Sequence, residues 1–159
     1  THVRHVLAFA GDTGGMQSIV PFGGHAHMRA VHAARPCESH EHVLQPSGDV
    51  HMSLPDYARF LQAHLKGLQG RDDLLTAATV RHLHTPRGVY GLGWGVGPHE
   101  GRLTSGHDGS DGTFYATAAL WHECDLAIAV AANMGGDMAS QACHAVSKTV
   151  ARIYLEKIS

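Results

Sequence analysis

The spacing of apolar residues predicts a helix that begins near residue 54. Ser53 is followed three residues later by Asp56, with Pro55 in the first turn, which is typical of a capped helix start. Apolar residues then recur every three or four positions, as on one face of a helix: Leu54, Tyr57, Ala58, Leu61, Leu65 and Leu68. We expect this helix to end near Gly67 or Gly70 and to pack its apolar face on another element.

Two further helices follow from the same period. A short one is predicted from Thr76 to His84, with Ala77, Val80 and Leu83 facing inward, and Pro86 stops it. The last segment, Met138 to Ile158, has one apolar face: Ala139, Ala142, Val146, Val150, Ile153 and Ile158. Such a helix is expected to lie across a sheet.

In the segment between these helices, the spacing of apolar residues becomes that of β-strands. Thr113 to Glu123 and Asp125 to Asn133 are β-like, and the connection between them is short enough for an antiparallel hairpin. Trp94 precedes them in a Gly-rich run and is expected in the core.

The chain divides near residues 45–48, where Gln-Pro-Ser-Gly indicates a turn. Residues 1–45 are interpreted as irregular with at most short strands, 46–86 as helical, 87–135 as antiparallel strands and 136–159 as the terminal helix. With 159 residues, 43% of them hydrophobic, the chain can bury a core, and a single domain is expected. The predicted fold class is α+β, an antiparallel β-sheet with packed helices.

Composition limits the partners. The formal net charge of -2 and the absence of any Lys/Arg run argue against nucleic acid or an anionic membrane as the main partner. No apolar stretch is long enough to predict a membrane span. Cys37, Cys124 and Cys143 are far apart in sequence and predict neither a disulfide framework nor a thiolate zinc site, so the localisation stays unknown.

The most informative stretch is Gly106-His107-Asp108-Gly109-Ser110-Asp111-Gly112. Glycine at every third position lets backbone approach a ligand closely, while a histidine supplies a titratable side chain. Taken alone, the same residues also fit a tight turn in a hairpin.

The order of motifs around this stretch resembles the C-terminal part of the serine β-lactamases and penicillin-binding-protein-like hydrolases, which include class C β-lactamases, DD-carboxypeptidases and esterases. Four more pieces carry the resemblance: Pro46-Ser47-Gly48, the helix start from Ser53 to Phe60, His84-Thr85-Pro86, and Tyr90-Gly91-Leu92-Gly93-Trp94. It covers residues 43–158 and implies a partial β-lactamase/transpeptidase-like fold.

The resemblance implies acyl transfer through a serine ester on β-lactam, D-Ala peptide or ester substrates. His107 takes the place of the Lys or His of the family's Lys-Thr-Gly or His-x-Gly triplet, and Gly109 that of its glycine. Ser110 would then supply a backbone N–H to the oxyanion hole. Asp108 departs from the usual Thr or Ser and would repel a substrate carboxylate unless it faces away, which favours ester or cationic substrates.

The nucleophile motif of that family is missing. None of Lys66, Lys148 and Lys157 has a serine three residues before it, so no Ser-x-x-Lys is present. We therefore expect a C-terminal portion of a larger hydrolase, inactive alone, that needs no cofactor. A catalytic Ser110 working with His107 is a weaker alternative, because their spacing does not ensure a hydrogen bond.

Two other functions stay open. Fifteen histidines, some in His-x-His pairs, suggest a metal-binding module if each pair lies in a strand and faces one ion; the pairs are His25/His27, His40/His42 and His82/His84. The second is a non-catalytic relative that binds a peptide in the same groove. An unfinished sheet would expose an apolar face and an open edge, which predicts self-association or pairing with a missing N-terminal half.

Overall fold

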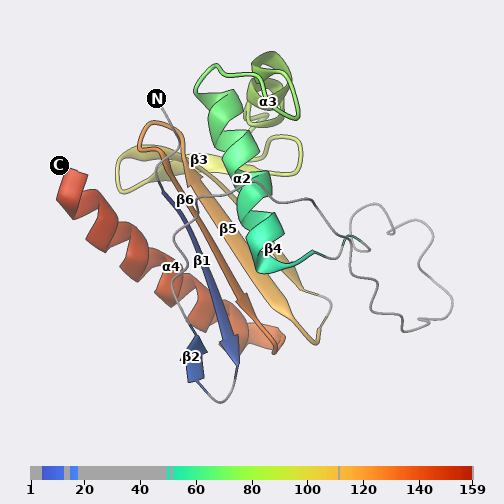
Figure 1. Ribbon diagram of the computed structural model, residues 1–159, viewed down its shortest axis with the longest axis vertical. Helices are drawn as coiled ribbons and strands as arrows, with labels where there is room; N and C mark the ends of the chain where they lie inside the picture. Colours follow the sequence, from blue (N-terminus) through green and yellow to red (C-terminus); the bar gives the residue numbers. More distant parts are fainter. Residues whose placement is uncertain (1–4, 13–14, 18–49, 51, 111, 159) are drawn as a thin grey trace, which may run out of the picture.

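The computed structural model describes residues 5–12, 15–17, 50, 52–110 and 112–158. Its centre is a sheet with helix α4 across one face and helix α2 across the other, as Figure 1 shows. Three layers therefore bury two separate cores, one on each face of the sheet.

The sheet has the strand order β2-β1-β6-β5-β4-β3. Its four later strands form an antiparallel meander: β3 (Gly95–His99), β4 (Arg102–Ser110), β5 (Tyr115–Trp121) and β6 (Leu126–Ala132). The predicted fold class, an antiparallel sheet with packed helices, is confirmed.

The first strand of the chain lies where the sequence had indicated irregular structure. Strand β1 (His5–Asp12) pairs parallel with β6, and the short β2 (Gly15–Gln17) pairs antiparallel with β1. Residues 6–10 are a continuous apolar run, which suits a central strand but lacks the alternation that marks a half-buried one. Strand β1 thus covers the outer edge of β6. Self-association through an open sheet edge stays a prediction.

The helices begin and end close to their predicted bounds: α2 at Leu54–Leu68, α3 at Ala77–Leu83 and α4 at Gly136–Ile158. The hydroxyl of Ser53 accepts the Asp56 N–H at 3.3 Å, and Thr76 caps α3 in the same way. Local capping signals therefore determine both helix starts. No helix in the described part of the chain is long and apolar enough to cross a membrane.

Alternate residues of the two central strands supply the two cores. On the α2 face, Leu120 and Ala129 pack with Leu61 and Leu65 of the helix. On the α4 face, a second cluster gathers from both strands and the helix: Trp121, Leu126, Ile128, Val130, Ala151 and Leu155.

Gly67 of α2 lies in close contact with Val80 of α3. A Cβ atom built at Gly67 would lie 2.5 Å from the Cβ of Val80, which is too close for two carbon atoms. We expect Gly67→Ala to lower the free energy of unfolding by about 2 kcal/mol, because the overpacked helices must separate. Urea unfolding measures this loss.

A matched glycine provides the control for this substitution. A Cβ at Gly97 meets nothing within 4 Å, so Gly97→Ala is expected to change the free energy of unfolding by less than about 0.5 kcal/mol. Equal losses in the two variants would show that the α2–α3 contact is not the cause.

Candidate functional site

The segment singled out in the sequence forms the end of strand β4. His107, Asp108, Gly109 and Ser110 are its last four residues, and all are exposed. Strand β3 pairs with β4 only from Arg102 to Gly106, whereas β5 pairs with it as far as Ser110. Within the described residues, the last four positions of β4 therefore have a strand on one side only. An unpaired strand edge of this kind presents backbone N–H groups to a ligand.

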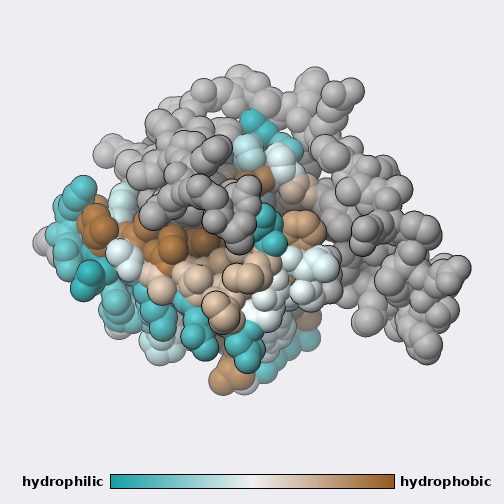
Figure 2. All heavy atoms as spheres, turned by 90° about the horizontal axis from the view of Figure 1, so that it is seen from below, coloured by the Kyte–Doolittle hydropathy of each residue, from teal (hydrophilic) through white to brown (hydrophobic). Residues whose placement is uncertain are grey.

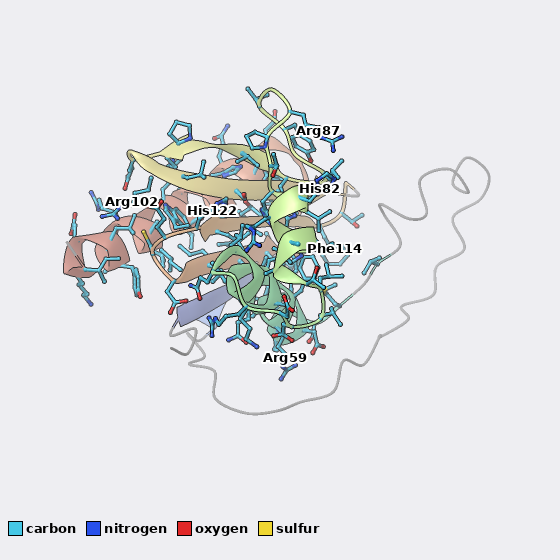
Figure 3. The ribbon with its side chains drawn as sticks, turned by 90° about the horizontal axis from the view of Figure 1, so that it is seen from above. Arg59, His82, Arg87, Arg102, Phe114 and His122 are labelled. Atoms are coloured by element: carbon cyan, nitrogen blue, oxygen red, sulfur yellow. The ribbon has the colours of Figure 1, made fainter. Side chains whose placement is uncertain are left out.

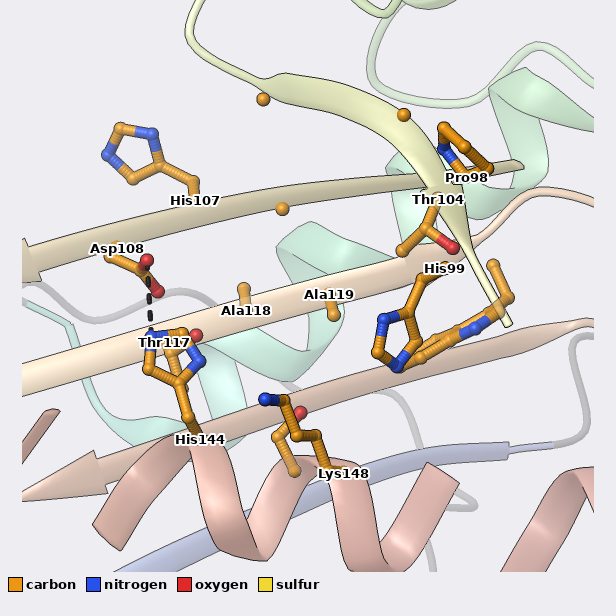
Figure 4. Close-up of a pocket in the computed structure, with 15 residues that line it drawn as sticks. Pro98, His99, Thr104, His107, Asp108, Thr117, Ala118, Ala119, His144 and Lys148 are labelled. Carbon is orange, nitrogen blue, oxygen red and sulfur yellow. Dashed lines mark ion pairs between the residues drawn. The ribbon is translucent and has the colours of Figure 1, made fainter. Parts of the chain in front are cut away.

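The pleat of β4 separates the neighbouring side chains of His107 and Asp108. Figure 4 shows His107 on one face of the strand and Asp108 on the other, where it points toward His144 of α4. The Asp108 carboxylate lies 3.5 Å from Nε2 of His144. Asp108 therefore faces away from the side on which His107 lies, which is the condition under which its charge would not repel a substrate carboxylate there.

The imidazole of His107 contacts two aromatic side chains. The Tyr90 hydroxyl is 3.2 Å from Nδ1, and the ring of Trp94 meets the imidazole edge to face with the centroids 6.3 Å apart. Tyr90 is about half exposed, whereas Trp94 is buried in the α2-side core, as its sequence context predicted. His107 is thus supported by the core on one side and open on the other.

The hydroxyl of Ser110 belongs to the turn that follows the strand. It donates to the carbonyl of Phe114 at 2.6 Å and accepts the N–H of Gly112 at 3.1 Å. Gly112 has a φ of +91°, so the tight turn considered for this sequence lies directly after β4. The structure does not bring the Ser110 hydroxyl and His107 together as a nucleophile and base.

An apolar margin lies next to this turn. The exposed side chains of Phe114, Met134 and Met138 come from the β4–β5 turn and the β6–α4 junction. These two segments touch, because a Cβ at Gly135 would collide with the backbone of Gly112. Figure 2 views the molecule from this end and shows apolar surface among the described residues.

A shallow groove of about 300 Å³ lies on the opposite face of β4, between β3 and α4 (Figure 4). Three glycines form its floor because they stand at the positions of β3 and β4 that face α4: Gly95, Gly97 and Gly106. Asp108, His144 and Lys148 line its sides. His107 also borders the groove, although its side chain lies on the other face of β4 from that of Asp108.

The family model for Beta-lactamase matches residues 8–148 of the chain. The chain belongs to the β-lactamase family. No curated protein and no solved structure matches it significantly. Family membership confirms the resemblance carried by the central segment and its flanking motifs.

In this β-lactamase family chain, a row of three buried polar side chains and one half-buried histidine lies next to Trp94. Nδ1 of His64 is 2.8 Å from Nε2 of His84, whose Nδ1 is 2.8 Å from the Ser105 hydroxyl, and this hydroxyl is 2.7 Å from Nε2 of His122. We call these four residues the histidine chain. The row joins α2, the end of α3, β4 and the end of β5.

The histidine chain is held neutral by its surroundings. Burial lowers the pKa of His64 to about 4. Burial, with His64 and His122 as further causes, lowers the pKa of His84 to about 3. Burial also lowers the pKa of His122, although Glu123 opposes this shift. Neutral imidazoles in such a row can all donate in one direction or all in the other, so every hydrogen bond is satisfied in both arrangements.

Sequence reasoning missed the histidine chain and gave His84 a different role. The metal-binding hypothesis required His82 and His84 to lie in a strand and face the same way, but His82 lies in α3 and His84 caps it. His82 is exposed beside Arg87 (Figure 3), whereas His84 is buried in the core. This pair therefore cannot hold one ion, and the described residues contain no group of three or more potential ligands placed to hold a metal. The pairs His25/His27 and His40/His42 lie outside the described residues.

One signal in the sequence could have revealed the buried row. His64 occupies a position on the apolar face of α2, three residues after Leu61 and directly before Leu65. A polar side chain on an apolar face needs a hydrogen-bond partner in the core. Tyr90, which lies beside His107, belongs to the Tyr90-Gly91-Leu92-Gly93-Trp94 motif, and that motif alone did not indicate a contact with His107.

Proposed function

We propose that this chain forms one wall of an acyl-serine hydrolase site and that a part of the enzyme outside this sequence supplies the nucleophile. The substrates would be β-lactams, D-Ala peptides or esters. One observation carries the proposal: the end of β4, with the His107-Asp108-Gly109 triplet, is exposed, and no strand of the described part of the chain pairs with one of its edges. Membership of the β-lactamase family supports this reading.

The proposed role of β4 is to bind the acyl group beside its open edge. A serine attacks the carbonyl carbon, its proton passes to a neighbouring base, and the carbonyl oxygen gains the negative charge. The N–H of Ser110 is proposed to hold this oxygen together with an N–H of the nucleophile. Gly109 leaves room for the ligand, since a Cβ there meets nothing within 4 Å.

The nucleophile is proposed to come from elsewhere for two reasons. The sequence contains no Ser-x-x-Lys, because the residues three before Lys66, Lys148 and Lys157 are Ala63, Ala145 and Tyr154. The Ser110 hydroxyl already makes two hydrogen bonds within a turn. A serine used in this way is poorly placed to attack a carbonyl carbon.

Binding and covalent chemistry can be tested separately on the purified chain. Addition of benzylpenicillin should shift the backbone amide NMR signals of Gly109 and Ser110, and Gly109→Val should abolish these shifts by filling the open space. Intact mass spectrometry after incubation with penicillin or a fluorophosphonate should show no adduct. An adduct on a serine would overturn the proposal that the nucleophile lies elsewhere, and unchanged amide signals at millimolar penicillin would overturn the proposed site.

A further inference from the structure

The phenol of Tyr90 is fixed in place beside His107 by the backbone around it. The carbonyl of Tyr90 accepts the N–H of Arg87 at 2.8 Å, and the carbonyl of Trp94 accepts the N–H of Gly91 at 2.7 Å. Tyr90 also forms an isolated bridge with Gly95, the first residue of β3. The short loop before β3 thus holds the tyrosine against the sheet, with its hydroxyl 3.2 Å from Nδ1 of His107.

Trp94 also contacts the imidazole. Its ring is buried and packs against His84 with the two ring planes 27° apart and the centroids 4.7 Å apart. The edge-to-face contact with His107 therefore comes from a side chain that the core holds still. Among the described residues, the imidazole keeps Nδ1 on Tyr90 and leaves Nε2 for a ligand.

The protonation of the two ring nitrogens decides what His107 can do. A neutral imidazole has one N–H donor and one acceptor nitrogen, whereas a lysine ammonium has donors only. In the triplet, His107 stands at a position where lysine also serves, so the nitrogen facing the ligand must carry a hydrogen. It does so in the neutral ring only if Nδ1 is the acceptor.

We propose that Tyr90 is a positioning residue that donates its hydroxyl hydrogen to Nδ1 of His107 and so keeps Nε2 protonated toward the ligand. This inference rests on the proposed acyl-binding role of β4. It defines the ligand further: the group that meets His107 is a hydrogen-bond acceptor, such as a carbonyl or carboxylate oxygen. Asp108 does not oppose such a group, since its carboxylate lies on the other face of the strand.

Nitrogen-15 NMR of the histidine side chains, recorded at neutral pH without ligand, tests this inference. The wild-type chain should show His107 protonated at Nε2, and Tyr90→Phe should convert it to a mixture of the two tautomers. The affinity for benzylpenicillin, from the amide shifts, should fall about fivefold, as for the loss of one hydrogen bond. His107 protonated at Nδ1 in the wild type, or an unchanged tautomer in the variant, would overturn the inference.

A second tyrosine–histidine pair on the other face provides the control. The Tyr115 hydroxyl lies 3.2 Å from Nε2 of His144, so Tyr115→Phe should alter the His144 signals and leave those of His107 unchanged. Unaltered His144 signals in Tyr90→Phe show that the variant is folded. Because the tautomer is read without ligand, penicillin that fails to bind the wild type contradicts the proposed function alone.

Discussion

Replacing His84 by alanine is expected to lower the free energy of unfolding by about 3 kcal/mol or more. His84 is the centre of the histidine chain and makes hydrogen bonds at both ring nitrogens. Its loss leaves His64 and the Ser105 hydroxyl without their shared partner in the core, and a buried unsatisfied polar group costs about 1 to 3 kcal/mol. The imidazole also packs on Trp94, so a cavity adds to the loss. Urea unfolding at pH 7.5 measures the effect.

The exposed neighbour His82 is the matched control. Its side chain is solvent-accessible and lies beside Arg87, so His82→Ala is expected to cost less than about 0.5 kcal/mol. If His84→Ala were as mild as His82→Ala, the row of hydrogen bonds would contribute little to stability.

The helices were predictable because their signals are local. Ser53 and Thr76 cap the helices that follow them, and the apolar residues of each buried face recur about once per helix turn. Strand β1 was not predictable, because it forms by pairing with β6, which lies more than 100 residues later in the chain. A continuous apolar run of five residues does not by itself distinguish a central strand from a segment of a buried helix.

The sequence located the segment that forms the candidate site but not the directions of its side chains. Glycines and the family resemblance located the stretch from Gly106 to Gly112, but the side to which each residue points depends on the register of β4 with β5. That register places His107 on the α2 face and Asp108 on the α4 face. Tyr90 lies 17 residues before His107, and no local pattern joins the two.

The histidine chain was hidden for the same reason. His64 and His84 are 20 residues apart, and Ser105 and His122 are 17 apart, so each contact forms only when different elements pack together. The row nevertheless bears on the site, because His84 packs against the same Trp94 that contacts His107. Stability of the buried row and orientation of the exposed imidazole are therefore linked through one indole ring.

The second large effect is expected on acidification. In the folded protein the pKa of His64 is about 4 and that of His84 about 3, whereas an unfolded histidine has a pKa near 6.5. Between these values the unfolded chain binds more protons than the folded one, so the free energy of unfolding falls as the pH falls. The stabilisation is complete above about pH 6.5 and is lost toward pH 4, by up to about 1.4 kcal/mol per pH unit for each histidine.

Urea unfolding between pH 7.5 and pH 4.5 measures this slope, and one variant assigns it to the row. His64→Leu removes one proton-binding group from the unfolded chain, so its free energy of unfolding should depend less steeply on pH than that of the wild type. The three histidines act through shared hydrogen bonds, so the slope belongs to the row and not to one member. A wild-type stability that stays constant from pH 6.5 to pH 4.5 would show that the folded protein accepts protons in the row without cost.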